Sequence, residues 1–244
     1  MRNRNSMRAT VVLWFVLCLP SIAQNKKVVY VEYATIKVTA ETSSNLEPVF
    51  KQGVDTFVNV LESITFELVA NDSIAVFKKI EKLPTDEPHP LSKILGNGTY
   101  FTNLKSKEKI KIIDASGQAF SVVVPFDEYQ WEITSETKTI NGFKCYKAKT
   151  QKEKYVEWRN ETIITEPEVW FSPEIPFRFG PFGLIGLPGL ILEASLNGKV
   201  YYHATKIDLD YKLPSTKELR RPNKGKFVTE KEMEQITMKM DSRK

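Results

Sequence analysis

Few side chains in this sequence have the type and spacing that catalysis requires. A serine hydrolase needs a nucleophile at a sharp turn and a base within reach, but no Gly-x-Ser-x-Gly string occurs. The two histidines are isolated, His89 in a proline-rich stretch and His203 at an expected strand position. We interpret His203 as a half-buried strand residue, because no catalytic signature surrounds it. The sequence therefore assigns no catalytic residue.

Signatures of metal and cofactor sites are missing from the sequence as well. The histidines and cysteines do not show the short spacings of zinc ligands. Asp127, Glu128, Glu132 and Glu136 could gather around calcium, but the glycine-bearing loop of an EF-hand is absent. Solvated strand faces explain these carboxylates better. We expect no metal and no cofactor.

The most unusual segment is an apolar loop at residues 177–193, which is interrupted by four glycines and two prolines. Such a chain turns repeatedly, so it forms neither a helix nor one continuous strand. It must fold against a core, a ligand or a lipid surface. It could be a structural plug that closes one end of a sheet, or it could line or cover an apolar pocket. If exposed, it would be a patch for a partner.

This loop and its flanks carry the candidate site. Glu174 and Glu193 bracket the apolar run and could form an acid–base pair, although carboxylates at such a rim more often cap backbone N–H groups or face water. The predicted ligand or partner loop comprises Trp170, Phe171, Phe177, Phe179, Phe182, Leu184, Leu187, Leu190, Glu174 and Glu193.

The elements that would position these residues are strands. Apolar residues recur mostly at every second position, with β-branched and aromatic types favoured. Asn71-Asp72 and Asn197-Gly198 indicate tight hairpin turns. Successive strands with short turns favour a mainly β fold, either a strongly curved antiparallel sheet or a partly open barrel. Strands are expected at residues 28–38, 63–70, 73–80, 109–113, 120–124, 131–137, 143–150, 154–159, 168–171, 190–196 and 199–208.

A short amphipathic helix is expected near the C-terminus. Thr229 and Glu232 have the spacing of a capping box, and an apolar stripe follows at Met233, Ile236, Thr237 and Met240. The sequence thus divides into a signal peptide (1–23), a curved β domain (24–211), and a basic tether with the C-terminal helix (212–244). Residues 83–90 are rich in proline and are expected to be a surface linker.

The first 23 residues have the three parts of a secretory signal peptide. Arg2, Arg4 and Arg8 precede an apolar stretch at residues 11–19, and small residues surround a cleavage point after Ala23. A lipid anchor at Cys18 is the less favoured alternative, because bulky Leu17 precedes it. No later stretch has the length and apolarity of a membrane-spanning helix. We expect export to the periplasm, the outer envelope or the medium.

Charge and cysteine content narrow the function further. The net charge is +5, and three positive charges lie in the signal peptide. No lysine and arginine stripe interleaved with aromatics is present, so nucleic acid is not an expected partner. Cys145 alone would remain after cleavage, and its place in an alternating strand predicts a buried, inert thiol.

Gly186-Leu187-Pro188-Gly189-Leu190-Ile191 resembles the hexapeptide that names the GLPGLI family of exported Bacteroidetes proteins, also called Porph_ging. Similar blocks lie in the expected order at residues 131–138, 140–148 and 170–181, so the resemblance covers about residues 131–208. Residues 152–168 depart from the pattern, being longer and more charged. The resemblance implies export, but the family's function is unassigned, so no catalytic residue is carried over.

Together these features favour a non-enzymatic role without deciding whether the protein is an enzyme. The leading hypothesis is an exported binding or carrier module for an apolar or peptide-like ligand. One alternative is an envelope protein–protein interaction module that serves an outer-membrane receptor through the loop or the C-terminal helix. A second alternative is a hydrolase with a carboxylate site at Glu174 and Glu193.

Overall fold

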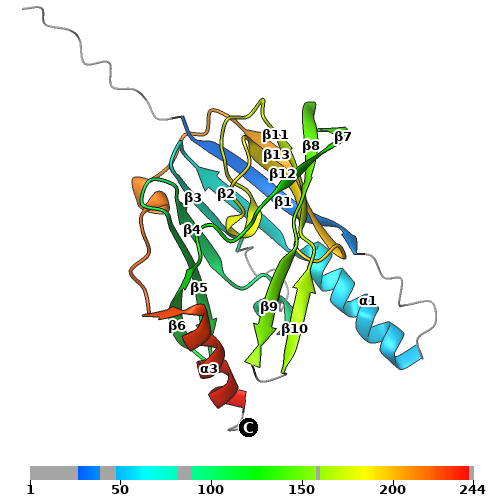
Figure 1. Ribbon diagram of the computed structural model, residues 1–244, viewed down its shortest axis with the longest axis vertical. Helices are drawn as coiled ribbons and strands as arrows, with labels where there is room; N and C mark the ends of the chain where they lie inside the picture. Colours follow the sequence, from blue (N-terminus) through cyan, green and yellow to red (C-terminus); the bar gives the residue numbers. More distant parts are fainter. Residues whose placement is uncertain (1–26, 39–47, 82–89, 158–159, 242–244) are drawn as a thin grey trace, which may run out of the picture.

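The computed structural model describes residues 27–38, 48–81, 90–157 and 160–241. Most of these residues belong to one large sheet with the strand order β14-β6-β5-β4-β3-β2-β1-β13-β12-β11-β8-β7. Neighbouring strands are antiparallel, except that β14 runs parallel to β6. The sheet curves strongly and stays open (Figure 1). The predicted fold class, a mainly β protein with a curved sheet and a short C-terminal helix, is confirmed.

The large sheet consists of β1 (Val29–Val38), β2 (Thr65–Ala70), β3 (Ile74–Lys79), β4 (Thr99–Asn103), β5 (Glu108–Ala115), β6 (Gln118–Val124), β7 (Glu132–Ile140), β8 (Phe143–Lys149), β11 (Glu168–Ser172), β12 (Leu190–Ser195), β13 (Val200–Asp208) and β14 (Lys226–Thr229). A separate hairpin is formed by β9 (Lys152–Val156) and β10 (Glu161–Thr165). The helices are α1 (Pro48–Ser63), α2 (Pro90–Ile94), α3 (Glu230–Asp241), and two 3₁₀ turns, η3 (Pro181–Gly183) and η4 (Thr216–Leu219). The sequence patterns missed α1, α2, β4, β10 and β14.

Alternating burial explains why these segments form strands. In β1, Val29, Val31 and Tyr33 are fully buried, whereas Tyr30 and Glu32 between them are half-buried on the other face of the sheet. The predicted hairpin turn before β3 is confirmed: the Asn71 side-chain oxygen accepts from the backbone N–H groups of Ser73 (2.9 Å) and Ile74 (2.8 Å). Asn and Asp favour such turns because their side chains bond their own following backbone.

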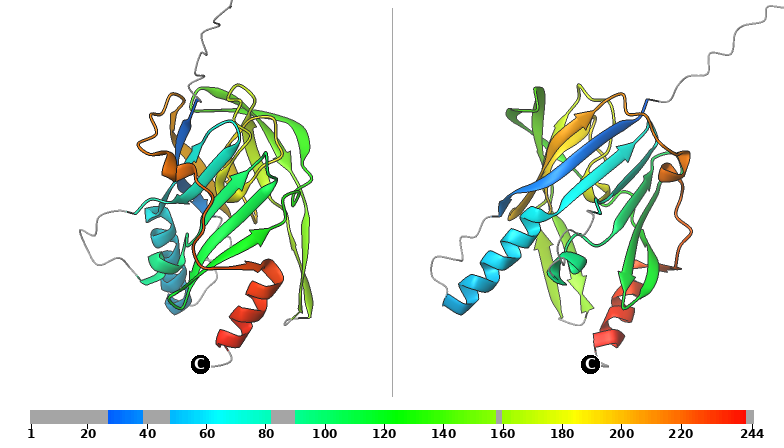
Figure 2. Two further views of the ribbon diagram at one scale, coloured as in Figure 1. Left: turned by 90° about the vertical axis from the view of Figure 1, so that its left-hand side faces the viewer. Right: turned by 180° about the vertical axis from the view of Figure 1, so that it is seen from behind.

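The apolar loop between β11 and β12 folds back into the hollow of the curved sheet (Figures 1 and 2). Ile175, Phe179, Leu184 and Leu187 are each at most 2 % exposed. At Gly189 an added Cβ would lie 2.1 Å from the Ser172 carbonyl oxygen, so only glycine fits there. Of the three interpretations that the sequence left open for this loop, a plug, a pocket lining and an exposed partner patch, the structure favours the plug.

The C-terminal helix begins as predicted. The Glu232 carboxylate accepts from the Thr229 backbone N–H (2.7 Å), and the Thr229 hydroxyl accepts from the Glu232 N–H (3.2 Å). Met233 is buried, and Ile236 and Met240 pack against the cluster formed with β6 and β14. Capping and this apolar stripe together hold α3 on the sheet.

The segment before α3 is less free than a solvated tether. Leu219 is buried in a cluster with residues of β2, β3, β4 and β5, and Arg221 pairs with Glu108 at 2.6 Å. The hydroxyl of Ser121 donates to the Lys224 carbonyl (2.6 Å). The basic side chains therefore lie on the outer side of a segment whose apolar residues anchor it. The domain division at residue 211 stays a prediction.

Some predictions concern residues outside this description. The signal peptide, with Ala23 and Cys18, and the proline-rich linker up to His89 lie outside the described residues. Within the described ranges, no helix combines the length and apolarity that crossing a bilayer requires.

Candidate functional site

Most residues of the predicted ligand loop are core side chains. Phe171, Phe177, Phe179, Leu184, Leu187 and Leu190 are all buried. Trp170 and Phe182 are half-buried, and Glu174 is exposed. Phe182 is the member that reaches a cavity, at the turn η3. The loop thus serves mainly the interior, and a ligand contact by its members stays a prediction.

Trp170 and Glu193 belong to a polar row on the sheet. The strand register places Lys147, Trp170, Glu193 and His203 side by side across β8, β11, β12 and β13. Glu193 accepts from Lys138 Nζ through Oε1 (2.6 Å) and contacts His203 Nδ1 through Oε2 (3.0 Å). Burial acts to raise the pKa of Glu193, but the hydrogen bonds from His203 and Lys138 outweigh it and lower that pKa. His203 is half-buried in a strand, as predicted.

This row is satisfied by the chain itself. Both Glu193 oxygens are engaged, and the Lys138 ammonium lies 4.3 Å from the centroid of the Trp170 ring. Glu174 is exposed, and both oxygens of Glu193 contact Lys138 and His203, so the acid–base pair of Glu174 and Glu193 stays a prediction. A row whose charges and ring are already covered is better suited to holding strands together than to taking a ligand.

Two other predictions concern metal and thiol chemistry. Across the ranges that the structure describes, no group of three or more His, Cys, Asp or Glu side chains is placed to hold a metal ion. Cys145 is fully buried, as predicted. Burial raises the pKa of its thiol to about 11, so the thiolate is scarce at neutral pH.

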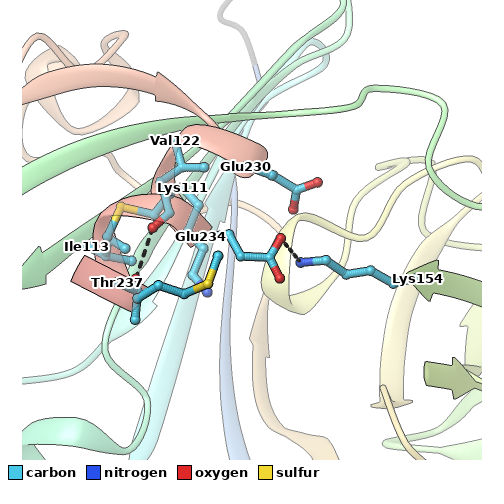
Figure 3. A pocket seen from close by; sticks show the side chains of 9 residues that line it. Lys111, Ile113, Val122, Lys154, Glu230, Glu234 and Thr237 are labelled. Atoms are coloured by element: carbon cyan, nitrogen blue, oxygen red, sulfur yellow. Dashed lines mark hydrogen bonds and ion pairs between the residues drawn. The ribbon is translucent and has the colours of Figure 1, made fainter. Parts of the chain in front are cut away.

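An open cleft lies instead between the sheet and two elements that flank its edge. It has a volume of about 440 Å³ and is bounded by β5 and β6, by β9, and by α3 (Figure 3). We call it the α3 cleft. It is lined by Lys111, Ile113, Val122, Lys154, Glu230, Met233, Glu234, Thr237 and Met238.

The α3 cleft combines an apolar floor with charged walls. Ile113, Val122 and Met233 belong to the cluster under α3. Two lysines and two glutamates surround this floor, so the lining carries no net charge. Lys154 Nζ reaches Glu234 Oε2 across the cleft at 3.8 Å (Figure 3). This pair is partly exposed and therefore weak, so a ligand can separate it at little cost.

A buried charge network fixes β9 against the sheet beside the cleft. Glu128 accepts from Lys109 Nζ (2.7 Å) and also from Lys152 Nζ. Lys109 is only 4 % exposed. Burial acts to raise the pKa of Glu128, but the two ammonium groups outweigh it and lower that pKa. A second ion pair, Lys231 to Glu157 at 2.9 Å, connects α3 with the end of the hairpin.

Sequence reasoning missed most of this cleft. Of its lining, only Met233 and Thr237 had been singled out, as part of the stripe that docks α3. One signal was nevertheless present in the sequence. Residues 152–168 were noted as longer and more charged than the GLPGLI pattern, and they include the β9–β10 hairpin, whose strand β9 forms one wall of the cleft. No local pattern joined that hairpin to β5 or α3, which lie far from it in sequence.

Comparison with known families gives a match for more than half of the chain. A family model described as "N-glycanase peptide, N-terminal domain" matches residues 97–231. The matched region begins just before β4 and ends within α3, so it includes Lys111, Lys154 and Glu230 of the cleft. No curated protein matches the chain.

Two solved structures share the fold. They are structures of PNGF-II in the C2 and P21 space groups, with TM-scores of 0.51 and 0.53 and a sequence identity of 16 % in both. They cover 86 % and 87 % of this chain, which spans 33 % of the PNGF-II chain in each. At this identity the likeness shows the fold alone.

The resemblance to the GLPGLI (Porph_ging) family is wrong. The family match contains the hexapeptide and its flanking blocks, yet describes an N-glycanase domain. The physical reason lies in what the glycines do. Gly189 lets two backbone segments touch, and Gly186 has a φ of +99°. The glycines of the hexapeptide therefore serve the packing of this loop, and the hexapeptide by itself does not identify the family.

The functional hypotheses built on that resemblance need correction as well. The family match points to a glycan-related function and overturns the carrier module for an apolar or peptide-like ligand. The receptor-serving interaction module and the Bacteroidetes origin lose their support with the resemblance. The hydrolase with a carboxylate site at Glu174 and Glu193 is not tested by these findings, although Lys138 and His203 already engage both oxygens of Glu193.

Proposed function

Because the chain belongs to the family of N-glycanase peptide N-terminal domains, we propose that it recognises the sugar part of N-glycosylated proteins. The proposal concerns recognition by this domain, which spans a third of PNGF-II. The observation that carries it is the lining of the α3 cleft, where equal numbers of lysines and glutamates surround an apolar floor.

Such a lining suits a neutral, polyhydroxylated ligand. A sugar presents hydroxyl groups that both donate and accept hydrogen bonds, and its C–H faces are apolar. Glu230 and Glu234 accept from hydroxyls, while Lys111 and Lys154 donate to them. Met233 and Met238 adapt their shape to an irregular apolar surface. An ion of either sign would meet as many like charges as opposite ones.

Export would bring the cleft to its ligand. N-glycosylation acceptor sites lie on surface loops of secreted proteins. Export is predicted from residues 1–23, and we propose cleavage after Ala23 on that basis. Mass measurement of the protein recovered from the native host would then give a chain beginning at Gln24. A mass that includes Arg2–Arg8 would contradict this part of the proposal.

The test of recognition compares one glycoprotein before and after removal of its N-glycans. We expect binding to be lost on deglycosylation. The double variant Lys154→Met/Glu234→Gln should bind at least tenfold more weakly, because it removes the ammonium donor and replaces one acceptor oxygen of the carboxylate by an amide NH2 group. The matched control is Lys206→Met/Glu32→Gln, which removes an exposed ion pair of 3.1 Å elsewhere on the sheet. Equal binding to the deglycosylated protein would refute the proposal.

A further inference from the structure

A second cavity lies on the same face of the sheet as the α3 cleft. We call it the Phe182 pocket; its volume is about 310 Å³, at the lower end of the range for small-molecule sites. Its lining contains no lysine, arginine, aspartate or glutamate. The lining residues are Phe57, Leu61, Phe66, Phe77, Leu95, Gly96, Asn97, Gly98, Tyr100, Phe182, Leu196, Asn197, Val200 and Tyr202.

Phe182 is the centre of this pocket and has an unusual backbone. Its ring makes edge-to-face contacts with Tyr202 (centroids 4.6 Å apart), Phe77 (4.8 Å) and Tyr100 (5.8 Å). Its φ is +56°, a left-handed conformation that bulky residues rarely adopt. Such strain persists only where the surroundings enforce it, and it concentrates at functional sites. The plug therefore holds one aromatic ring at its tip in a costly conformation.

The polar atoms of the pocket are available to a ligand. Within the described part of the chain, the hydroxyls of Tyr100 and Tyr202 have no hydrogen-bond partner, although half-buried tyrosines usually find one. Burial raises the pKa of Tyr202, so its hydroxyl stays protonated. The Asn197 side-chain oxygen accepts from Lys199 N (3.0 Å) and Val200 N (3.1 Å), which orients its amide.

One row of the sheet connects this pocket with the α3 cleft. The register pairs Phe77 with Tyr100, Tyr100 with Lys111, and Lys111 with Val122. The first two line the Phe182 pocket and the last two line the α3 cleft. Lys111 Nζ lies 5.3 Å from the centroid of the Tyr100 ring. Directly opposed residues share a face, so the two cavities adjoin on one surface.

We infer that the Phe182 pocket is a second sugar subsite, which binds an uncharged N-acetylated sugar unit of the glycan whose neighbouring part occupies the α3 cleft. This inference rests on the proposed function and names the sugar class. Aromatic rings pack against the C–H face of a sugar, and free phenol hydroxyls and side-chain amides bond its hydroxyl and acetamido groups. Leu61 and Leu95 offer an apolar recess for the acetamido methyl. The uncharged lining disfavours acidic or amino sugars.

The test uses N,N′-diacetylchitobiose and, for comparison, cellobiose, which has the same linkage without the acetamido groups. We expect diacetylchitobiose to bind at least tenfold more tightly, by titration calorimetry. Tyr100→Phe/Tyr202→Phe should weaken it at least tenfold while the unfolding midpoint stays unchanged, because both rings remain. A purely structural role of these tyrosines would leave the affinity unmoved. The matched control is Tyr155→Phe, on the exposed face of the hairpin.

The outcomes separate this inference from the proposed function. If the glycoprotein binds through its glycan but the two sugars bind alike, or the tyrosine variants change nothing, the second subsite is wrong and the proposed function stands. If the glycoprotein binds equally after deglycosylation, the proposed function fails. If diacetylchitobiose is preferred and the tyrosine variants alone weaken it, the subsite is supported.

Discussion

The α3 cleft and the Phe182 pocket share one face of the sheet but are built in opposite ways. The cleft lies between β5 and β6, β9, and α3, which are far apart in sequence. The ion pairs of Lys152 with Glu128 and of Lys231 with Glu157 hold its hairpin wall to the sheet and to α3. The Phe182 pocket is formed by neighbouring strands, the plug and α1, and interlocking aromatic rings hold it. We therefore expect the stability of the α3 cleft to depend on charge and pH, and the stability of the Phe182 pocket to depend on packing and backbone strain.

The largest effect on stability is expected from removing the carboxylate of Glu128, which anchors β9 beside the cleft. Glu128→Gln leaves Lys109, which is 4 % exposed, without its carboxylate. We expect a loss of about 3–5 kcal/mol in the free energy of unfolding, as for other broken buried ion pairs. Urea unfolding measures it.

Two variants control this result. Lys109→Met/Glu128→Leu removes both charges and should recover most of the lost stability. Glu136→Gln, at a carboxylate that is 52 % exposed, should change it little. A double variant as unstable as Glu128→Gln would show that the ion pair is not what holds this region.

A smaller effect is expected at the tip of the plug. Phe182→Ala should cost about 2 kcal/mol, because a half-buried ring is lost. Phe182→Gly should be the more stable of the two by about 0.5–1 kcal/mol, since glycine adopts a φ of +56° without strain. Glycine is otherwise the more destabilising residue. If alanine proves more stable, Phe182 is not strained.

Low pH should destabilise the region of the α3 cleft before the region of the Phe182 pocket. The pKa values of Glu128 and Glu193 are lowered in the folded protein, so their contribution to stability is complete above the ordinary pKa of about 4.3. It is lost as the pH falls through the lowered values. In hydrogen exchange corrected for pH, we expect β9 to lose protection before β2 and β3. Simultaneous loss would contradict the distinction.

The smallest stability effect is expected at the rim of the cleft. Lys154→Met removes a partly exposed ion pair to Glu234 (3.8 Å) and should change the free energy of unfolding by no more than about 0.5 kcal/mol. Thermal unfolding measures it. The same substitution removes the ammonium group that would donate a hydrogen bond to a sugar hydroxyl, so glycan binding should still weaken. A loss of several kcal/mol would mean that Lys154 serves the fold.

Local patterns predicted much of the sheet. The alternation in β1 and the turn at Asn71 were sufficient for their strands, and the capping box at Thr229 located the start of α3. Helix α1 was missed because its valines and Gly53 have weak helix propensity, and the burial of Val60 and Leu61 is decided by the sheet. Likewise, β14 is a short strand defined by its parallel pairing with β6.

The candidate site was harder to predict for the same reason. The apolar loop stood out in the sequence, but its leucines and phenylalanines are inside the protein. The cleft is made of ordinary residues, such as Lys111, Lys154 and Glu234, that become a site only when distant elements meet. Phe182 was included among the loop residues, but nothing local showed that it alone of them would reach the Phe182 pocket.

The most direct test of glycan recognition follows the methionine methyl groups of the intact protein by NMR. Met233 and Met238 line the α3 cleft, whereas Met240, two residues beyond Met238 on the same helix, is outside the lining. On titration with an asparagine-linked N-glycan, we predict saturable shifts at Met233 and Met238, with Met240 little changed. No shift at either cleft methionine at saturating glycan would contradict the account.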